Sequence, residues 1–391
     1  MTPAARIETA AELLERIAVG EAAEKVLTAW ARRSRFAGSS DRAAIRDLVF
    51  DALRCRRSFG WLGGGNSGRA AMLGHCRAHS IDPTEVFTGV LYAPATLSNK
   101  ERELPPPLAE APLAVRCDVP DWVLPLLRKS LGGDAEAILL RLRERAPVFL
   151  RSNRLKCSRD MAIERLKAEG FDARPHELAE TAIVVEGHVR KISASAALGD
   201  GMVEFQDASS QVVIERLAPL LPDARVLDYC AGGGGKALAM AAHSPAHLVA
   251  HDIKSARMRD IEPRAARADA KIAVTTRPEG VFDLVVCDAP CSGSGAWRRQ
   301  PDAKWRLDQA MLNELTATQD AILDAARKFV RRGGHLAFVT CSLLSRENED
   351  RIARFLAQNP TWVKVDGLRL TPLDGGDGFY LAVLKAPDAT R

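Results

Sequence analysis

The sequence predicts an α/β protein in three parts: an all-helical domain over residues 1–125, a small α+β domain over residues 130–203 and a doubly wound α/β domain over residues 204–391. Two observations carry this prediction. Residues 1–125 place apolar residues at three- and four-residue spacing without strand-type alternation. From residue 204 onward, short apolar runs alternate with helical segments, as in a parallel sheet with helices on both faces. A length of 391 residues also suits two or three domains, at roughly 100–200 residues each.

The composition is that of a globular chain, with 47% hydrophobic and 27% charged residues. The net charge of +5 permits an anionic partner but does not require one. No run approaches the ~20 apolar residues of a membrane span, and the first residues lack the apolar core of a secretion signal. We therefore expect a cytoplasmic, monomeric protein with reduced cysteines and no membrane contact.

Two segments of the helical domain show the helical period: AAELLERIAVGEAAEKVLTAWARR and DRAAIRDLVFDALRCRRSFGWL. The second segment opens with Asp41 as the expected N-cap and ends at three consecutive glycines. Its basic residues could line a surface that faces nucleic acid, or only a solvated helix face: Arg46, Arg54, Arg56 and Arg57.

No metal site is predicted. The eight cysteines include no CxxC pair, which disfavours a zinc ribbon. His75, Cys76 and His79 resemble a ligand set, but a fourth ligand at usable spacing is missing.

The small domain is predicted to contain a strand, a helix and two further strands. The first strand is VFLRSN at residues 148–153, and the helix is RDMAIERLKAEG at residues 159–170. The other strands are IVVEG at residues 183–187 and the short basic segment VRKISA at residues 189–194. Such a mixture favours an α+β unit.

Four apolar strand-like runs in residues 204–391 end in polar or reactive residues: Asp228, Asp252, Asp288 and Cys341. Ligands of doubly wound sheets bind at the carboxyl ends of the strands. These four side chains are therefore the first candidates for a site.

A glycine-rich turn, Gly232 to Gly235, follows the first of these strands and opens a helix. Glycines let the backbone approach a ligand closely, and a helix N-terminus offers unpaired N–H groups. The spacing is neither GxGxxG nor the Walker pattern, because Lys236 is followed by Ala237. With Asp252 placed to bind ribose hydroxyls, the turn predicts a nucleoside cofactor, and a purely structural tight turn is the alternative.

The stretch DAPCSGSGAWRRQPDAKW, residues 288–305, combines a thiol with cations and an aromatic ring. Cys291 and Cys341 follow two strands of one sheet, so they can face the same crevice, with Asp288 able to supply a proton or a hydrogen bond. Taken singly, either thiol could instead pack under a loop. Phosphate contact and base stacking are expected of four residues: Arg298, Arg299, Lys304 and Trp305.

The C-terminal part contains, in order, the motifs FQDASSQ, LDYCAGGGGK, DAPCSGSG, RRQPDAKW, TCS and GDGFYLAVLKA. In these motifs the chain resembles the Sun-type RNA (cytosine-5)-methyltransferases, and within them the bacterial enzymes that methylate small-subunit ribosomal RNA. The resemblance covers residues 205–391 strongly and implies a Rossmann-like, S-adenosylmethionine-dependent methyltransferase domain. It implies an antitermination-factor-like RNA-binding domain for the N-terminal helices and an RRM-like unit for residues 130–203.

The family implies methylation of carbon 5 of cytosine in RNA, with 16S ribosomal RNA as the first candidate and S-adenosyl-L-methionine as the methyl donor. Cys341 would be the nucleophile that adds to carbon 6, and Cys291 would assist the elimination that frees the product. Asp288 would contact the cytosine ring nitrogen and also the cofactor, while Asp252 would bind the cofactor's ribose. The methionine part of the cofactor would be cradled by seven residues: Cys230, Ala231, Gly232, Gly233, Gly234, Gly235 and Lys236.

The chain departs from the family pattern in two places. It has CAGGGGKA at residues 230–237 where the family has CAAPGGKT, which loosens the loop. It offers Thr275 and Thr276 where the family has an acid for the adenine side. These departures motivate an alternative, an RNA-binding ribosome-assembly factor with impaired catalysis, against which the retained cysteines argue. A DNA methyltransferase is disfavoured, because those enzymes take their nucleophile from the earlier Pro-Cys motif.

Overall fold

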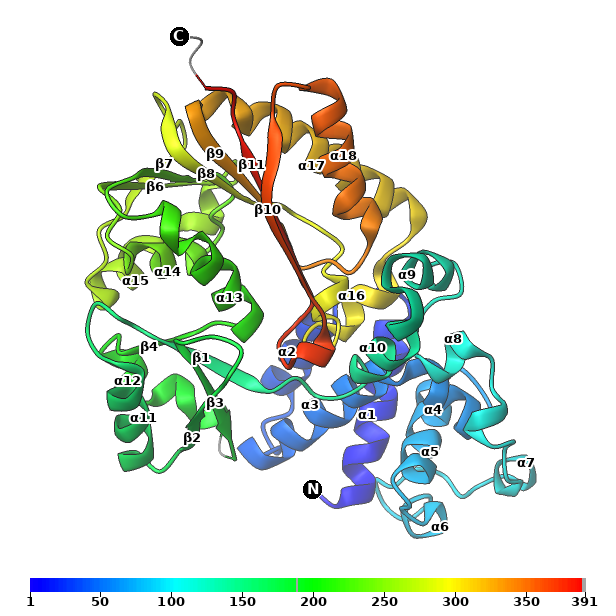
Figure 1. The fold of residues 1–391 in the computed structure, drawn as a ribbon. Helices are drawn as coiled ribbons and strands as arrows, with labels where there is room; N and C mark the ends of the chain where they lie inside the picture. The colour runs from blue at the N-terminus through cyan, green and yellow to red at the C-terminus, as the bar shows by residue number, and fades with distance from the viewer. Residues whose placement is uncertain (188, 389–391) are drawn as a thin grey trace. The chain divides into compact units, whose positions relative to one another are not determined.

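The computed structural model describes residues 1–187 and 189–388, which form two compact units (Figure 1). A helical unit comprises Met1–Arg145 together with Trp297–Asp308. A second unit comprises Ala146–Ala296 and Gln309–Arg391 and holds both β-sheets. Helices thus continue past residue 125, where the sequence analysis ends the helical domain. Among the described residues, no helix is both long enough and apolar enough to cross a bilayer.

The helical unit is built from helices, of which the first six and the last share one apolar core. In chain order, the helices of this unit are α1 (Pro3–Ala18), α2 (Ala23–Arg33), α3 (Ser39–Arg54), α4 (Arg56–Gly63), α5 (Gly68–Ala78), α6 (Pro83–Val86), α7 (Asn99–Arg102), α8 (Leu113–Arg116), α9 (Leu124–Leu131), α10 (Ala135–Arg141) and α16 (Pro301–Arg306). The first of them is capped at its start, because the Thr2 hydroxyl accepts the N–H of Ala5 and Pro3 occupies the first turn.

The segment predicted as one helix after Asp41 is two helices, α3 and α4. The expected N-cap is also wrong, because Asp41 lies in the first turn of α3 and accepts the N–H of Gly38, the residue that caps the helix. The chain breaks at Cys55 because the fully buried carboxylate of Asp118 accepts the N–H groups of Arg57 and Ser58 at 2.8 and 2.9 Å. These are first-turn donors that have no partner within their own helix.

The C-terminal end of α3 is closed by α16, about 250 residues later in the chain. The ammonium of Lys304 donates to the carbonyl of Arg54 at 3.1 Å, and the indole N–H of Trp305 donates to the carbonyl of Leu53 at 2.6 Å. Last-turn carbonyls lack intrahelical donors, and a cation beside them is favourable. Because Lys304 is only 1% exposed, the predicted RNA contact of this residue is not available here. The same holds for the indole N–H of Trp305, whose donor is already used.

The smaller sheet has the order β2-β3-β1-β4, with antiparallel neighbours throughout. Its strands are β1 (Val148–Ser152), β2 (Asp172–Pro175), β3 (Ala182–Glu186) and β4 (Val203–Phe205), and its helices are α11 (Arg159–Ala168) and α12 (Ala196–Gly199). The prediction of a strand at residues 189–194 is wrong, because this segment is a 3₁₀-helix. Its apolar residues Val189 and Ile192 are three apart, which a 3₁₀-helix places on one side, and both pack on this small core.

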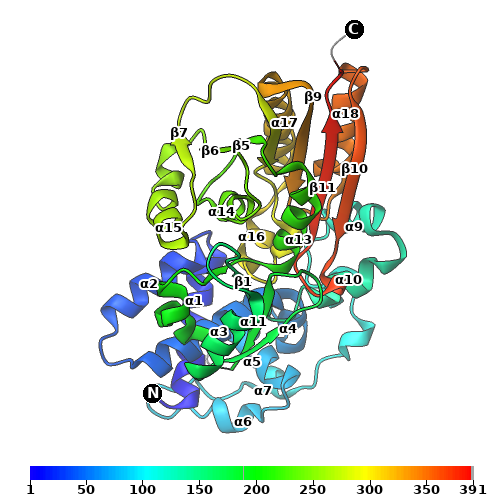
Figure 2. The same cartoon turned by 60° about the vertical axis from the view of Figure 1, so that its left-hand side comes forward.

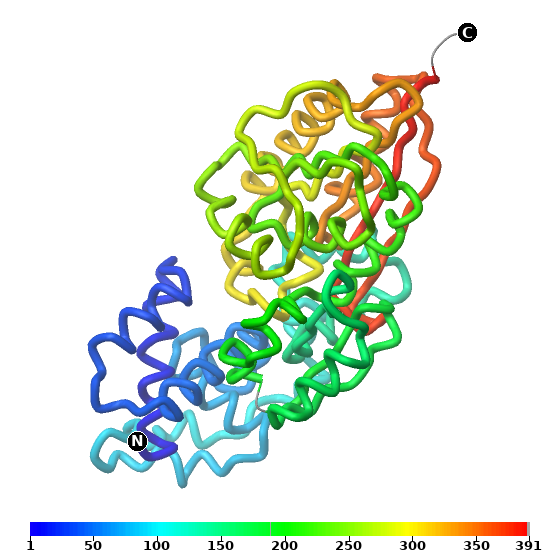
Figure 3. Tube along the Cα trace, turned by 90° about the vertical axis from the view of Figure 1, so that its left-hand side faces the viewer, coloured from blue at the N-terminus to red at the C-terminus, as the bar shows by residue number. Residues whose placement is uncertain are grey.

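The larger sheet has the order β10-β11-β9-β8-β5-β6-β7. Its strands are β5 (Arg225–Asp228), β6 (His247–His251), β7 (Ala273–Thr275), β8 (Phe282–Asp288), β9 (Val330–Thr340), β10 (Val363–Leu370) and β11 (Phe379–Lys385). The central strands are parallel as predicted, whereas β10 and β11 run antiparallel along one edge and are drawn in red in Figure 3. The link between β10 and β11 is too short for a parallel crossover, which needs about a dozen residues or more.

Helices cover both faces of the larger sheet, as the doubly wound prediction requires (Figure 2). One face packs against α13 (Ala208–Leu217), α14 (Gly235–Ala241) and α15 (Ile261–Ala268); the other packs against α17 (Gln309–Ala326) and α18 (Glu349–Gln358). Neighbouring residues of β5 show the alternation, since Val226 lies in the first core and Leu227 in the second. Because β5, β6, β8 and β9 are parallel, their carboxyl ends lie at the same edge of the sheet.

Replacing Lys304 with Met is expected to lower the free energy of unfolding by about 2 kcal/mol. The α3 carbonyl would lose its donor, and the buried Asp118 would lose a positive charge that interacts with it. Chemical denaturation followed by circular dichroism measures the change. The matched control is Lys328→Met at an exposed lysine, which should change stability by less than ~0.5 kcal/mol. Equal stabilities of the two variants would contradict the capping role.

Candidate active site

Two thiols lie together at the carboxyl edge of the larger sheet. β8 and β9 are adjacent and parallel, with Asp288 opposite Val339, so the loops that follow them start side by side. Cys291 and Cys341 project from these loops, and their sulfur atoms are 3.5 Å apart. Both thiols are half-buried. The prediction that the two strand-end cysteines face one crevice is therefore supported by their contact.

An ion pair between a buried lysine and a half-exposed carboxylate adjoins the thiols. The ammonium of Lys236, in the first turn of α14, donates to the Asp288 carboxylate at 2.7 Å and lies over the ring of Phe379. Burial works against the charged ammonium, but the charges of Asp288, Cys341 and Asp228 outweigh it and raise the pKa of Lys236. The site thus holds a lysine that stays protonated beside a carboxylate that points to the same edge.

The Cys291 thiol is held in its protonated form. Its hydrogen bond with Cys341, its burial and the neighbouring charges of Cys341 and Glu347 raise the pKa of Cys291 well above its ordinary value. A protonated Cys291 thiol therefore contacts the sulfur of Cys341. A thiol with a raised pKa, once deprotonated, is a strong proton acceptor.

The glycine-rich turn has a backbone conformation that favours glycine at two positions. Gly232 and Gly234 have φ of +52° and +79°, which L-residues rarely adopt. A Cβ on Gly234 would lie 2.9 Å from a side-chain carbon of Ile261. The turn is tied to the next strand, because the N–H of Gly232 donates to Asp252 at 3.1 Å. The family's Ala and Pro at residues 232 and 233 are thus replaced by glycine in a loop whose conformation needs it at least at Gly232.

Asp252 is almost fully buried and already has partners. Its carboxylate accepts the N–H groups of Gly232 and Lys254, and it pairs with the guanidinium of Arg257 at 3.0 Å. To bind ribose hydroxyls, as predicted, the carboxylate would exchange its bond to the half-exposed Arg257 side chain and keep its backbone donors. On the next strand, β7, the Thr275 hydroxyl closes a local turn with Arg277.

Asp228 is a carboxylate without a partner. It is fully buried at the end of β5, and neither of its side-chain oxygens has a hydrogen-bond partner among the described residues. Burial and the charge of Asp288 raise the pKa of Asp228 to about 7. The sequence predicts this acid at the end of a strand, but it is not among the residues predicted to bind the cofactor. Next to the glycine-rich turn, its oxygens could accept a hydrogen bond from a ligand.

The predicted basic residues of the helical unit serve its own structure. Arg298 is 3% exposed, and its carbonyl accepts a hydrogen bond from the buried Arg54. Arg46 pairs with Glu24, and Arg57 pairs with Asp121 at 2.7 Å. Of the four arginines of the predicted basic face, three thus bond within the helical unit, namely Arg46, Arg54 and Arg57, and the nucleic-acid surface stays a prediction.

The histidines His75 and His79 of the helical unit lie beside Asp51, which their sequence spacing does not indicate. One ligand-type atom each of Asp51, His75 and His79 lies within 4.8 Å of the others. Asp51 already accepts from His75 at 3.1 Å, and the guanidinium of Arg54 lies 3.7 Å from its other oxygen. Because a cation would meet this guanidinium, we assign no metal site here.

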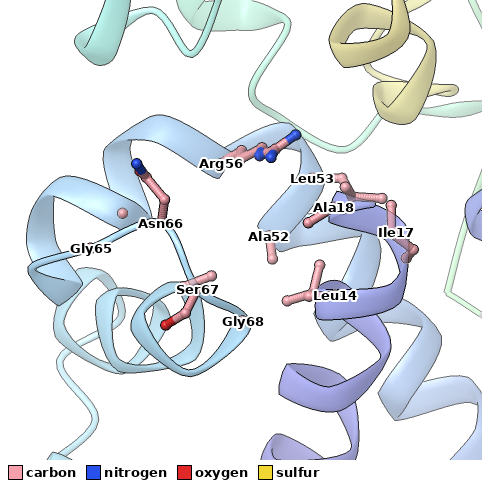
Figure 4. A pocket seen from close by; sticks show the side chains of 12 residues that line it. Leu14, Ile17, Ala18, Ala52, Leu53, Arg56, Gly65, Asn66, Ser67 and Gly68 are labelled. Atoms are coloured by element: carbon pink, nitrogen blue, oxygen red, sulfur yellow. The ribbon is translucent and has the colours of Figure 1, made fainter. Parts of the chain in front are cut away.

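The pocket of Figure 4 does not compete as a ligand site. It lies between α1, α3 and the turn before α5, with Leu14 and Ser67 among its lining residues. Its volume is about 30 Å³. That is far smaller than the roughly 300–1,000 Å³ of a small-molecule pocket.

Comparison with protein families shows which proteins this chain resembles. Residues 216–385 match the model described as 16S rRNA methyltransferase RsmB/F, and residues 119–191 match the model of the ferredoxin-like domain of the RsmF/B-like methyltransferases. The ribosomal RNA small subunit methyltransferase B of Cronobacter sakazakii is 33% identical over 284 residues, 68% of this chain and 66% of that protein. Its counterpart in Shewanella oneidensis is 31% identical over 313 residues, 74% of this chain and 72% of that protein. The match to the Cronobacter protein thus spans just under two thirds of its length.

Solved structures show the same fold. The crystal structure of PH0851 superposes with a TM-score of 0.76 at 20% identity and covers 98% of this chain and 99% of its own. The structure of NSun6 from Pyrococcus horikoshii with SFG has a TM-score of 0.61 at 18% identity and covers 68% of this chain and 98% of its own. At these identities the likeness establishes the fold alone.

The pH dependence of stability should reveal the isolated Asp228. Its folded-state pKa of about 7 lies above the unfolded-state value of about 3.9, so the stability is complete below pH 4 and falls as the pH rises through 7. Between pH 5 and pH 8 the native chain should lose about 2–3 kcal/mol relative to the Asp228→Asn variant.

Urea denaturation at both pH values measures this difference. The control is Asp172→Asn at an exposed strand residue, which should parallel the native chain. Parallel curves for Asp228→Asn and the native chain would show that this carboxyl titrates normally.

Proposed function

Because the chain belongs to the RsmB/F family of 16S rRNA methyltransferases, we propose that it transfers a methyl group from S-adenosyl-L-methionine to carbon 5 of a cytosine in 16S ribosomal RNA. The observation that carries this proposal is the contact of the Cys291 and Cys341 sulfurs, 3.5 Å apart at the carboxyl edge of a methyltransferase-type sheet. Such a substrate would place the reaction in the cytoplasm. The monomeric state stays a prediction.

The residues at the sheet edge fit the cofactor. The turn from Cys230 to Lys236 would present its backbone to the methionine part, and Asp228, whose side-chain oxygens have no hydrogen-bond partner among the described residues, offers an acceptor for the amino group. Asp252 would hold the ribose. When bound, S-adenosylmethionine supplies a methyl group on a positively charged sulfur.

The two thiols divide the chemistry. Carbon 5 of cytosine is a poor nucleophile until a thiolate adds to carbon 6, so we assign that addition to Cys341. Asp288, held by Lys236, would bond the cytosine ring nitrogen and stabilise the adduct. After methylation, the carbon 5 proton passes to a base, and the electrons of that carbon–hydrogen bond expel the Cys341 sulfur from carbon 6 as a thiolate. Cys291, in contact with that sulfur, would assist this elimination.

RNA recognition is proposed for the rest of the chain. Of the predicted contact residues, Arg299 keeps a half-exposed side chain, whereas Arg298 and Lys304 are buried. The base must be unstacked to reach the thiols. An assembly factor with impaired catalysis is not favoured, because both thiols, Asp288 and Lys236 keep a mutual geometry that RNA binding alone does not need.

Replacing Cys341 with Ala should reduce methyl transfer by at least about 10³-fold, since the enamine cannot form without the adduct. Incorporation of labelled methyl groups into 16S ribosomal RNA measures the rate. Cys157→Ala, at a buried thiol of the small sheet's core, is the matched control and should stay near the native rate. Full activity of Cys341→Ala would overturn the assignment of the nucleophile.

Replacing Cys291 with Ala should trap the reaction after methyl transfer, because elimination loses its assisting thiol. A covalent complex of protein and RNA should then accumulate and shift in a denaturing gel. The double variant Cys291→Ala, Cys341→Ala should show no such complex. Rapid turnover by Cys291→Ala without a trapped complex would contradict the release role.

A further inference from the structure

A buried carboxylate, Glu347, joins the two cysteine loops. Its side chain is 0% exposed and lies six residues after Cys341, just before α18. One oxygen accepts the N–H of Ser292 at 2.7 Å, and the other accepts the hydroxyls of Ser292 and Ser342. Each of these serines directly follows one of the cysteines, so one carboxylate holds both.

The same carboxylate is fixed from a third direction by α17. The side-chain amide of Gln319 donates to Glu347 at 3.1 Å and to the carbonyl of Pro290 at 2.9 Å. Pro290 directly precedes Cys291. The loop that carries Cys291 is therefore bound on both sides of the thiol, by Glu347 itself and by an amide that contacts Glu347.

Further hydrogen bonds link the loop that carries Cys291 to the loop that carries Cys341. The hydroxyls of Ser294 and Ser342 lie 3.1 Å apart, and the N–H of Leu343 donates to the Ser294 hydroxyl at 2.8 Å. The N–H of Gly295 donates to the carbonyl of Cys341 at 2.9 Å. A fully buried carboxylate is costly unless donors satisfy it, and here the donors come from both loops.

We propose that Glu347 is a positioning residue that holds Cys291 and Cys341 in sulfur contact. The hydrogen bonds of its carboxylate go to other residues than the two cysteines, so it acts on the thiols through Ser292 and Ser342. Its catalytic consequence rests on the proposed function, whereas the sulfur contact does not. Its negative charge also contributes to the raised pKa of the Cys291 thiol.

The test is the rate at which the two thiols form a disulfide. An azodicarboxamide oxidant takes up the two thiol hydrogens and is reduced to its hydrazine while the sulfur–sulfur bond forms. The readout is mass spectrometry of the linked Cys291 and Cys341 peptides in the full chain, and it needs neither RNA nor cofactor. In Glu347→Gln the side-chain NH₂ group would face the N–H and hydroxyl donors that now bind the carboxylate. We therefore expect the disulfide to form about tenfold more slowly.

The matched control is Glu349→Gln, two residues further on, where the half-exposed carboxylate pairs with Arg369 and contacts neither serine. It should oxidise at the native rate. If Glu347→Gln does not fold, Ser342→Ala keeps the charge and removes one link, and a rate reduction of about threefold is expected. Native rates in folded Glu347→Gln, or in Ser342→Ala where the first variant fails, overturn the proposal.

A second readout separates this proposal from the proposed function. For methylation of RNA, Glu347→Gln should lower kcat and leave KM for S-adenosylmethionine near the native value, because the glycine-rich turn is untouched. If the native chain does not methylate RNA but disulfide formation is slowed in Glu347→Gln, the proposed function is refuted and the positioning role of Glu347 is supported. An active native chain, with both kcat and the disulfide rate unchanged in folded Glu347→Gln, would refute the positioning role of Glu347 alone.

Discussion

The parallel pairing of β8 with β9 is the constraint on which the site depends. It starts two loops side by side at one edge of the sheet, and each loop delivers a thiol within four residues of its strand. The neighbouring strand β5 delivers the glycine-rich turn and Lys236 to the same edge. Strand order therefore brings these groups together from distant parts of the sequence.

Much of this arrangement can be predicted from the sequence. The alternation of apolar runs and helices predicts the sheet, and the residues at the strand ends predict the edge at which Asp288 and Cys341 meet. The antiparallel edge is not predicted, because the apolar run of β11 has the same pattern as a buried parallel strand. Local periodicity also misses the break at Cys55, since a carboxylate about sixty residues away caps the second helix.

The failures at the site share one physical cause, which is that long-range burial decides the role of a charged residue. Lys304 and Trp305 have the composition of an RNA contact, but two carbonyls of α3 use their donors. Asp228 looks like any strand-end acid until its lack of partners is seen. For Glu347 a signal does exist, because both cysteines occur in Cys-Ser dipeptides and Glu347 is the first acid after the second of them.

The capping of α3 by α16 affects how the chain folds as it is synthesised. The helical unit is otherwise complete at Arg145, yet its closing helix ends at Arg306. N-terminal domains usually fold first as a chain leaves the ribosome, at about 5–20 residues per second. Here the first domain must wait roughly 8–30 s for its last piece. During that delay the carbonyls at the end of α3 lack these two side-chain donors, although the helical unit is still complete before the second unit, which continues from Gln309.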